Sequence, residues 1–235
     1  MNVVIGGASG IGAAVAAMLP GETLVADRAG GEVDCDVTDR ASLDAVVGLV
    51  DRLDALVVTA GLSPALAGAD AIMAVNLAGT ANVLDAFDPL IGEGTVVVLL
   101  ASMAGHMGQY PAEVLSALDD PATAPGAGLT DDAATAYMMS KLGVIRLVRR
   151  TAGSYGGRGA RIVSVSPGVV DTPMGKKEFA SGNGTAETAA AGAFGRQARP
   201  EELAEVIAFV CSPKASFVTG VDWLVDGGAV AALMG

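Results

Sequence analysis

The chain has 235 residues, a length that suits one α/β domain with a full hydrophobic core. Hydrophobic residues make up 51% of the sequence and charged residues 17%, which excludes an intrinsically disordered protein. The net charge of −12 argues against nucleic acid or anionic lipid as a partner and gives no general attraction for acidic substrates, so we expect a small, apolar, neutral molecule.

The predicted elements alternate regularly between strand and helix. Short Val-rich runs predict buried strands, and Ala-rich runs with helical spacing predict helices. In chain order they are a strand (2–5), a helix (10–19), two strands (22–26 and 33–35), a helix from a cap at Thr38 or Asp39 to Val50, a strand (55–59), a helix (69–87), a strand (95–101), a helix (133–153), a strand (160–165), a helix (200–211) and a strand (221–225). Parallel strands need such crossovers, so we predict an α/β fold: a single domain over residues 1–235 with a doubly wound, Rossmann-type parallel sheet.

Two stretches interrupt this alternation. Residues 108–132 contain three prolines and a short helical pattern near Ala112–Leu118, and residues 176–197 are rich in Gly, Ala and Thr. Long loops in a compact domain are usually functional or mobile. Both stretches follow strands whose ends should border a cofactor, so we interpret 108–132 as an insertion and 176–197 as a substrate loop.

The N-terminus lacks the basic start of a secretory signal, because the first Lys or Arg is Arg28. No run reaches the ~18 apolar residues that a membrane helix needs. Cys35 and Cys211 have neither disulfide-framework nor metal-ligand spacing, and His106 is the single histidine. We therefore expect a cytoplasmic protein without a metal site and without a membrane partner.

A glycine-rich turn follows the first predicted strand. Gly6-Gly7-Ala8-Ser9-Gly10-Ile11-Gly12 has the spacing G-x-x-x-G-x-G and opens the first predicted helix. Glycines here allow a tight turn and a close approach of the backbone to a pyrophosphate, and the helix N-terminus offers free N–H groups to the phosphates. The position after the first strand favours a dinucleotide site over a plain helix-entry loop. Ser9 would either cap the helix or contact a phosphate.

Asp27 ends the second predicted strand, and Arg28 follows it. A carboxylate at this point can accept hydrogen bonds from both ribose hydroxyls of the adenosine half, and it would repel a 2′-phosphate. The arginine would either bind a 2′-phosphate or be a solvated surface charge, and the glycine turn adds no second basic residue. We therefore predict NAD rather than NADP as the cofactor.

Tyr137 and Lys141 lie four positions apart in a helical stretch, which places both side chains on one face. A tyrosine is a poor base at neutral pH because its ordinary pKa is about 10. An adjacent ammonium stabilises the tyrosinate and lowers that pKa, so the pair can carry a proton. The spacing alone is weak, because an exposed helical pair has the same pattern.

With these motifs and others in the same order, the chain resembles the short-chain dehydrogenase/reductase family over nearly its whole length. The matching residues are Gly6, Gly10 and Gly12, Asp36-Val37, Ala60-Gly61, Asn76, Ser102, Tyr137 and Lys141, Pro167-Gly168 with Thr172, and Asp226-Gly227-Gly228. Each match is weak by itself. All of them in family order, most at the ends of predicted elements, are jointly specific.

The resemblance implies a role for each of these residues. Tyr137 would exchange a proton with the substrate oxygen, Ser102 would hold that oxygen, and Lys141 would lower the pKa of Tyr137 and bind the nicotinamide ribose. Asn76 would position a water that links Lys141 to solvent. The predicted cofactor contacts are Gly6, Ser9, Gly10, Ile11, Gly12, Asp27, Arg28, Asp36, Val37, Ala60, Gly61, Tyr137, Lys141, Pro167, Gly168, Val170 and Thr172.

The chain departs from the family pattern in three places. Ile5 stands where the family usually has Thr, Thr59 stands where it usually has Asn, and the connection between Ser102 and Tyr137 is longer than in many members. A similar insertion occurs in the bacterial 3-alpha-hydroxysteroid dehydrogenase/carbonyl reductase group, which the chain resembles within the family. The insertion would cover or rebuild a surface that many relatives use to form tetramers, so the resemblance implies a homodimer or a homotetramer.

Five methionines fall near the predicted site and would either line a pocket for a bulky apolar substrate or pack in the core: Met103, Met107, Met138, Met139 and Met174. His106 would contact substrate or, as the favoured interpretation, be an ordinary surface or loop histidine.

The sequence thus predicts an NAD(H)-dependent oxidoreductase that interconverts a secondary alcohol and a ketone on an apolar, alicyclic or steroid-like substrate. Two alternatives stay open: an NAD-binding regulator without catalysis, and an epimerase or dehydratase that uses the same Tyr/Lys pair. The intact set of Asn76, Ser102, Tyr137 and Lys141 argues against the regulator. The absence of a predicted second domain argues against the epimerase or dehydratase.

Overall fold

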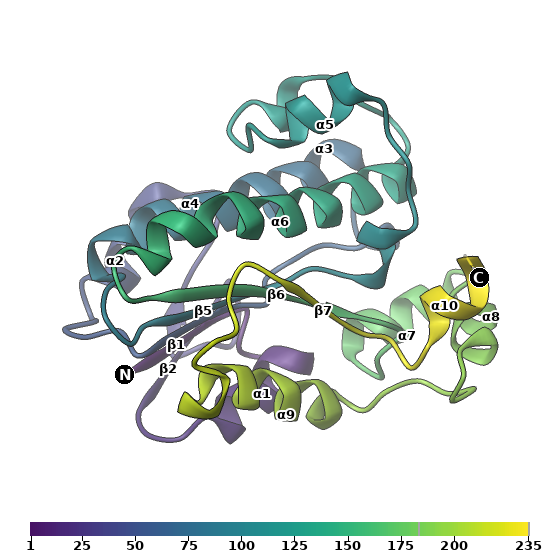
Figure 1. Cartoon of the computed structure of the whole chain (residues 1–235). Coiled ribbons are helices and arrows are strands. Elements are labelled where there is room, and N and C mark those ends of the chain that lie inside the picture. Colours follow the sequence, from purple (N-terminus) through teal and green to yellow (C-terminus); the bar gives the residue numbers. More distant parts are fainter. Residues whose placement is uncertain (183, 235) are drawn as a thin grey trace.

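One seven-stranded sheet organises the protein, whose computed structural model describes residues 1–182 and 184–234 (Figure 1). Every adjacent pair of strands is parallel, in the order β3-β2-β1-β4-β5-β6-β7. The strands are β1 (Asn2–Ile5), β2 (Thr23–Asp27), β3 (Val33–Asp34), β4 (Ala55–Val58), β5 (Val96–Leu100), β6 (Arg161–Pro167) and β7 (Asp222–Val225). The order reverses between β1 and β4, and ligands of such sheets bind at the carboxyl ends of the strands at this point. The predicted fold class is confirmed.

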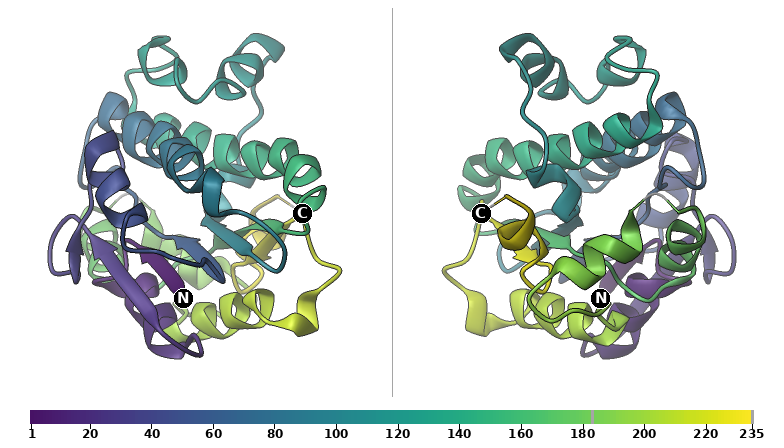
Figure 2. Two further views of the ribbon diagram at one scale, coloured as in Figure 1. Left: turned by 90° about the vertical axis from the view of Figure 1, so that its left-hand side faces the viewer. Right: turned by 90° about the vertical axis from the view of Figure 1, so that its right-hand side faces the viewer.

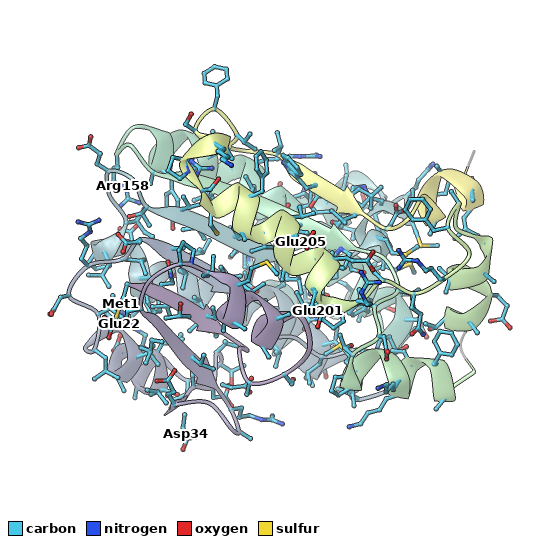
Figure 3. The ribbon with its side chains drawn as sticks, turned by 90° about the horizontal axis from the view of Figure 1, so that it is seen from below. Met1, Glu22, Asp34, Arg158, Glu201 and Glu205 are labelled. Carbon is cyan, nitrogen blue, oxygen red and sulfur yellow. The ribbon has the colours of Figure 1, made fainter. Side chains whose placement is uncertain are left out.

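Helices cover both faces of this sheet. On one face lie α2 (Arg40–Val47), α4 (Thr80–Phe87) and α6 (Ala133–Gly156), and on the other lie α1 (Gly10–Met18) and α9 (Pro200–Cys211) (Figure 1). Each face has its own apolar core, in which Val-rich strands pack on small and aliphatic helix side chains. Figure 3 shows Glu201 and Glu205 on α9, and both side chains are exposed. The polar outer side of α9 therefore faces solvent while its apolar side packs on the sheet.

The helix predicted over residues 69–87 is interrupted by a π-helical turn. It consists of α3 (Ala69–Met73), a π-helix (Ala74–Gly79) and α4. Short π-helical insertions are rare and frequently occur at functional sites. This turn carries Asn76, which is fully buried, and the Thr80 hydroxyl donates to the Asn76 carbonyl oxygen at 2.7 Å. Hydrophobic periodicity predicted the helix but gave no sign of the π-turn.

Residues 108–132 fold back over the outer side of α6 (Figures 1 and 2). The helical pattern expected there is α5 (Ala112–Leu118), and a 3-10 turn (Ala124–Gly126) follows. Leu118 and Ala124 are buried against α3 and α6. Asp119 accepts hydrogen bonds from Arg146 at 2.8 and 2.6 Å and also from Arg150, both on α6. Apolar and charged contacts together therefore fasten this segment to α6.

The prediction of a long loop over residues 176–197 is wrong, because two short helices occupy most of this range. They are α7 (Pro173–Ala180) and α8 (Thr185–Ala191), and residue 183 lies outside the described residues. The Thr172 hydroxyl accepts a hydrogen bond from the Gly175 backbone N–H at 2.9 Å and so caps α7, and Pro173 begins the helix. A terminal helix, α10 (Ala229–Met234), packs beside α8 and was not predicted. These helices are too short for a clear periodic pattern.

Among the described residues, no helix has both the length and the apolar character to cross a membrane.

Candidate active site

The glycine turn between β1 and α1 is shaped by backbone contacts that leave no room for side chains. Gly6 has φ +85°, and a Cβ there would lie 2.4 Å from the Ala60 backbone nitrogen. A Cβ on Gly12 would lie 2.2 Å from the Gly6 carbonyl oxygen. The first turn of α1 therefore packs directly on the end of the sheet. Ser9, Gly10 and Ile11 line the groove in front of it.

Two of the three departures from the family pattern, Ile5 and Thr59, lie beside this turn. The Thr59 hydroxyl contacts the Ile5 and Gly6 carbonyl oxygens at 3.1 and 2.9 Å, which ties the end of β4 to the glycine turn. Ser9 is the N-cap residue of α1, but its side chain makes no capping hydrogen bond. The capping alternative for Ser9 is therefore wrong. Ser9 is exposed in the groove, and a phosphate contact stays a prediction.

Acidic residues mark the far end of the same groove. Asp27 ends β2, and its carboxylate accepts a hydrogen bond from the Ala8 backbone N–H at 3.0 Å. Asp36 accepts hydrogen bonds from the backbone N–H and the hydroxyl of Thr38, which lower the pKa of Asp36. Arg28 is exposed, whereas Val37 is buried, and both line the groove.

Ser102, Tyr137 and Lys141 line one pocket, which adjoins this groove at Gly61 and Thr172. Ser102 follows β5, and its hydroxyl accepts a hydrogen bond from the Ala104 N–H at 3.2 Å. Tyr137 lies in the second turn of α6, one turn before Lys141. The predicted juxtaposition of these three side chains is therefore present.

Burial dominates the electrostatics of the Tyr137/Lys141 pair. It raises the pKa of Tyr137, a hydrogen bond with Ser102 opposes this, and the negative charge of Glu178 adds to it. Burial also lowers the pKa of Lys141 to about 8. The Lys141 ammonium donates to the Leu100 carbonyl oxygen at 2.9 Å and lies 5.8 Å from the centroid of the Tyr137 ring. Lowering of the Tyr137 pKa by Lys141 stays a prediction.

Asn76 lies behind the pocket and shapes it. Its side-chain amide pairs with Leu62, accepting from the backbone N–H at 2.7 Å and donating to the carbonyl oxygen at 2.9 Å, and it also donates to Ser140 on α6 at 3.2 Å. A Cβ on Gly61 would lie 3.2 Å from Asn76 Oδ1 and 3.6 Å from Lys141 Nζ. Asn76 and Lys141 thus converge on one glycine. The water-positioning role of Asn76 stays a prediction.

Methionines form much of the apolar side of the pocket. Met103, Met107, Met138 and Met174 line it, whereas Met139 is buried in a core cluster between α3 and α6. The remaining predicted cofactor contacts, Pro167, Gly168, Val170 and Thr172, line the same pocket. Sequence reasoning missed Glu178, which faces the pocket four residues after Met174 on α7. The four-residue spacing from Met174 would have placed Glu178 on the same side of a helix. Residues 176–197 were predicted to be a loop, so this spacing was not considered.

His106 is neither a pocket residue nor an ordinary surface histidine. Its Nε2 lies 2.8 Å from a carboxylate oxygen of buried Asp222, and the other oxygen of Asp222 accepts from Ser166 at 2.9 Å. The side chain of His106 is 28% exposed. The histidine therefore fastens the turn after Ser102 to β7, which the favoured interpretation did not foresee.

These features suit a dinucleotide along the carboxyl ends of the strands, because the glycine turn admits close backbone approach and the groove continues to Tyr137. Within residues 1–182 and 184–234, His, Cys, Asp and Glu side chains form no group of three that could hold a metal ion.

Comparison with known proteins identifies the family of this chain. The chain is 34% identical to the short-chain dehydrogenase/reductase bsc3 of Alternaria brassicicola, over 99% of this chain and 96% of that protein. The chain belongs to the short-chain dehydrogenase/reductase family. Another member, the 3-alpha-hydroxysteroid dehydrogenase/carbonyl reductase of Comamonas testosteroni, is 31% identical over 96% of this chain and 95% of that protein. Residues 125–230 match the family model described as enoyl-(acyl carrier protein) reductase.

A solved structure has a very similar fold. The 3-alpha-hydroxysteroid dehydrogenase from Pseudomonas sp. B-0831, complexed with NADH, superimposes with a TM-score of 0.88 at 29% identity. The match covers 99% of this chain and 98% of that one. The resemblance of this chain to the hydroxysteroid dehydrogenase/carbonyl reductase group is therefore confirmed.

Proposed function

We propose that this short-chain dehydrogenase/reductase is an NAD(H)-dependent enzyme that interconverts a secondary alcohol and a ketone on an apolar, alicyclic or steroid-like substrate. The observation that carries the proposal is the convergence of Ser102, Tyr137 and Lys141 on a methionine-lined pocket that adjoins the glycine-turn groove. Relatives that act on hydroxysteroids and carbonyl compounds support the substrate class.

The residues of the pocket suit the protonic half of this reaction. A bound nicotinamide dinucleotide would supply or accept the hydride. In the reductive direction the hydroxyls of Ser102 and Tyr137 bind the carbonyl oxygen, and Tyr137 gives that oxygen its proton. The buried Lys141 ammonium favours the tyrosinate that is left. In the oxidative direction Tyr137 takes the proton from the alcohol.

Replacing Tyr137 with Phe tests this role, because it removes only the hydroxyl from the pocket. We expect kcat to fall about 10³-fold, within the usual range for general acid–base catalysis, while the affinity for NAD stays within about threefold. Stopped assays on a panel of alicyclic alcohols, with NADH absorbance as readout, measure the first quantity. Calorimetric titration with NAD measures the second. Undiminished turnover in Y137F would refute the assignment.

The cofactor preference rests on Asp27, whose carboxylate lines the groove close to the backbone of Ala8. We expect kcat/KM for NAD to exceed that for NADP by about 100-fold, since a carboxylate at the end of β2 and a 2′-phosphate repel each other. Asp27→Ser should reduce this ratio by at least tenfold, mainly through KM for NADP. A wild-type preference for NADP would contradict the assignment and would give exposed Arg28 the phosphate-binding role.

We further propose a homodimer that pairs through β7 and α9. Residues 108–132 cover α6, whereas the β7 edge carries several exposed apolar side chains: Phe209, Phe217, Val221 and Leu224. Large exposed apolar patches mark interfaces. Sedimentation equilibrium should give twice the chain mass, and Phe217→Glu should shift it toward one chain. A wild-type mass of one chain would contradict this pairing, and a mass of four chains would contradict the homodimer.

A further inference from the structure

Glu178 brings a negative charge to the lining of the substrate pocket. It lies on α7 and lines the same pocket as Ser102 and Tyr137. Its Oε1 accepts a hydrogen bond from the Ala65 backbone N–H at 2.8 Å, so the side chain reaches from α7 to the turn after β4. Two separate walls of the pocket thus hold this carboxylate in place.

One other charged side chain lines the described part of the pocket. Among the described residues that line the pocket, the charged side chains are Lys141 and Glu178. The Lys141 ammonium is buried and donates to the Leu100 carbonyl oxygen, at the inner end of the pocket beside Gly61. The surrounding methionines and aliphatic groups screen charge less than water does, so a charge at Glu178 acts strongly on whatever enters.

We propose that Glu178 makes this enzyme exclude anionic substrates, so that its natural alcohol or ketone carries no carboxylate, phosphate or sulfate group. The inference rests on the proposed function and narrows it. The overall charge of −12 acts in the same direction at longer range.

The same carboxylate influences the catalytic tyrosine, which gives a second and independent measurement. Glu178 and burial both raise the pKa of Tyr137. Alcohol oxidation needs the tyrosinate, so removal of the Glu178 charge should lower the pKa of Tyr137 and move the rising limb of the pH profile to lower pH. Lys141, on α6, is the other charged side chain that lines the pocket around Tyr137, and it is unchanged in this comparison.

A matched pair of ketones tests the proposal. The probes are 4-oxocyclohexanecarboxylate and its methyl ester, which share the ring and the carbonyl group and differ in charge. Glu178→Gln keeps an oxygen that can accept from Ala65 but removes the charge. Glu187→Gln on α8 is the control, because Glu187 is exposed, does not line the pocket and loses the same charge.

The readout is the ester-to-acid ratio of kcat/KM and, in parallel, the acid-to-ester ratio of Kd on enzyme saturated with NAD, with which a ketone does not react. We expect both ratios to exceed one in the wild type, which means that the ester is preferred, and to fall about tenfold in E178Q. The repulsion between two like charges in a poorly screened pocket is large enough to change binding by at least tenfold. E187Q should leave both ratios within twofold. Ratios in E178Q within twofold of the wild type overturn the proposal.

Failure of the proposed function gives a different result. A protein that binds the ester over the acid in a Glu178-dependent way, yet turns over neither ketone, contradicts the proposed reaction and supports the charge filter. A protein that turns over both ketones with the same ratio in wild type and E178Q supports the reaction and contradicts the filter. An unchanged pH profile in E178Q also counts against a charge at this place.

Discussion

The nucleotide groove is built differently from the segments that cover α6 and the substrate pocket. The groove takes its shape from backbone that packs without intervening side chains, as at Gly6 and Gly12. The cover, made of residues 108–132 over α6 and of α7 and α8 beside the pocket, is fastened by side chains such as Leu118, Asp119 and Glu178. A backbone-defined site tolerates one residue type at each critical position, whereas a side-chain-defined cover can be rebuilt with many sequences.

Among the changes that test this contrast, the largest effect should follow from breaking the backbone-defined groove. Gly12→Ala places a methyl group 2.2 Å from the Gly6 carbonyl oxygen and 2.5 Å from Thr59 Oγ1, so the glycine turn must move. Overpacking of this kind costs about 1–3 kcal/mol. If NAD binding bears that cost, affinity falls by about 10- to 100-fold. Calorimetric titration with NAD measures the loss, and thermal unfolding measures any part borne by the fold.

Gly92→Ala is the matched control for this prediction. A Cβ on Gly92 meets no heavy atom within 4 Å, and its φ lies outside the left-handed region. We expect this variant to keep the NAD affinity and the unfolding temperature of the wild type. Equal NAD affinity in G12A and G92A would show that the glycine turn is not restricted by its packing.

This contrast also explains what the sequence could predict. The strands and the glycine turn could be predicted because each depends on local spacing or on a buried apolar run. Asp27, Ser102, Tyr137 and Lys141 line the groove or the pocket, since each lies at the end of a buried strand or at helical spacing. The predicted loop over 176–197 was wrong because α7 and α8 are short and partly exposed, so they lack a strong apolar period.

The missed features of the site depend on contacts between distant parts of the chain. Asn76, in the π-turn, makes side-chain hydrogen bonds to Leu62 and Ser140. Nothing in residues 69–87 alone indicates these two partners. The Glu178 carboxylate is held by the backbone N–H of Ala65, 113 positions earlier in the chain. His106 likewise pairs with Asp222, 116 positions later. A pattern within one window of sequence carries no information about such partners.

A smaller effect should follow from loosening the cover at Asp119, which joins residues 108–132 to α6. Asp119 and its partners Arg146 and Arg150 are each about one-third exposed, so solvent screens the interaction. Asp119→Asn should therefore lower the free energy of unfolding at pH 7 by only about 1 kcal/mol, or roughly 2–4 °C in Tm, with NAD affinity unchanged. Asp120→Asn, at an exposed neighbouring position, serves as the control.

The pH dependence of this difference distinguishes the ion pair from simple packing. The hydrogen bond from Arg146, together with the charge of Arg150, lowers the pKa of Asp119 in the folded protein. A carboxyl with a lowered folded pKa contributes stability that is complete above its unfolded value, about 3.9, and is lost as pH falls through the folded value. Thermal unfolding of wild type and D119N should thus differ most at pH 6–7 and converge below about pH 4. A Tm difference of the same size at pH 3 and pH 7 would mean that Asp119 stabilises the cover through packing and not through its charge. The cover and the glycine turn would then both depend on packing and would differ only in whether side chains or backbone atoms make the contacts.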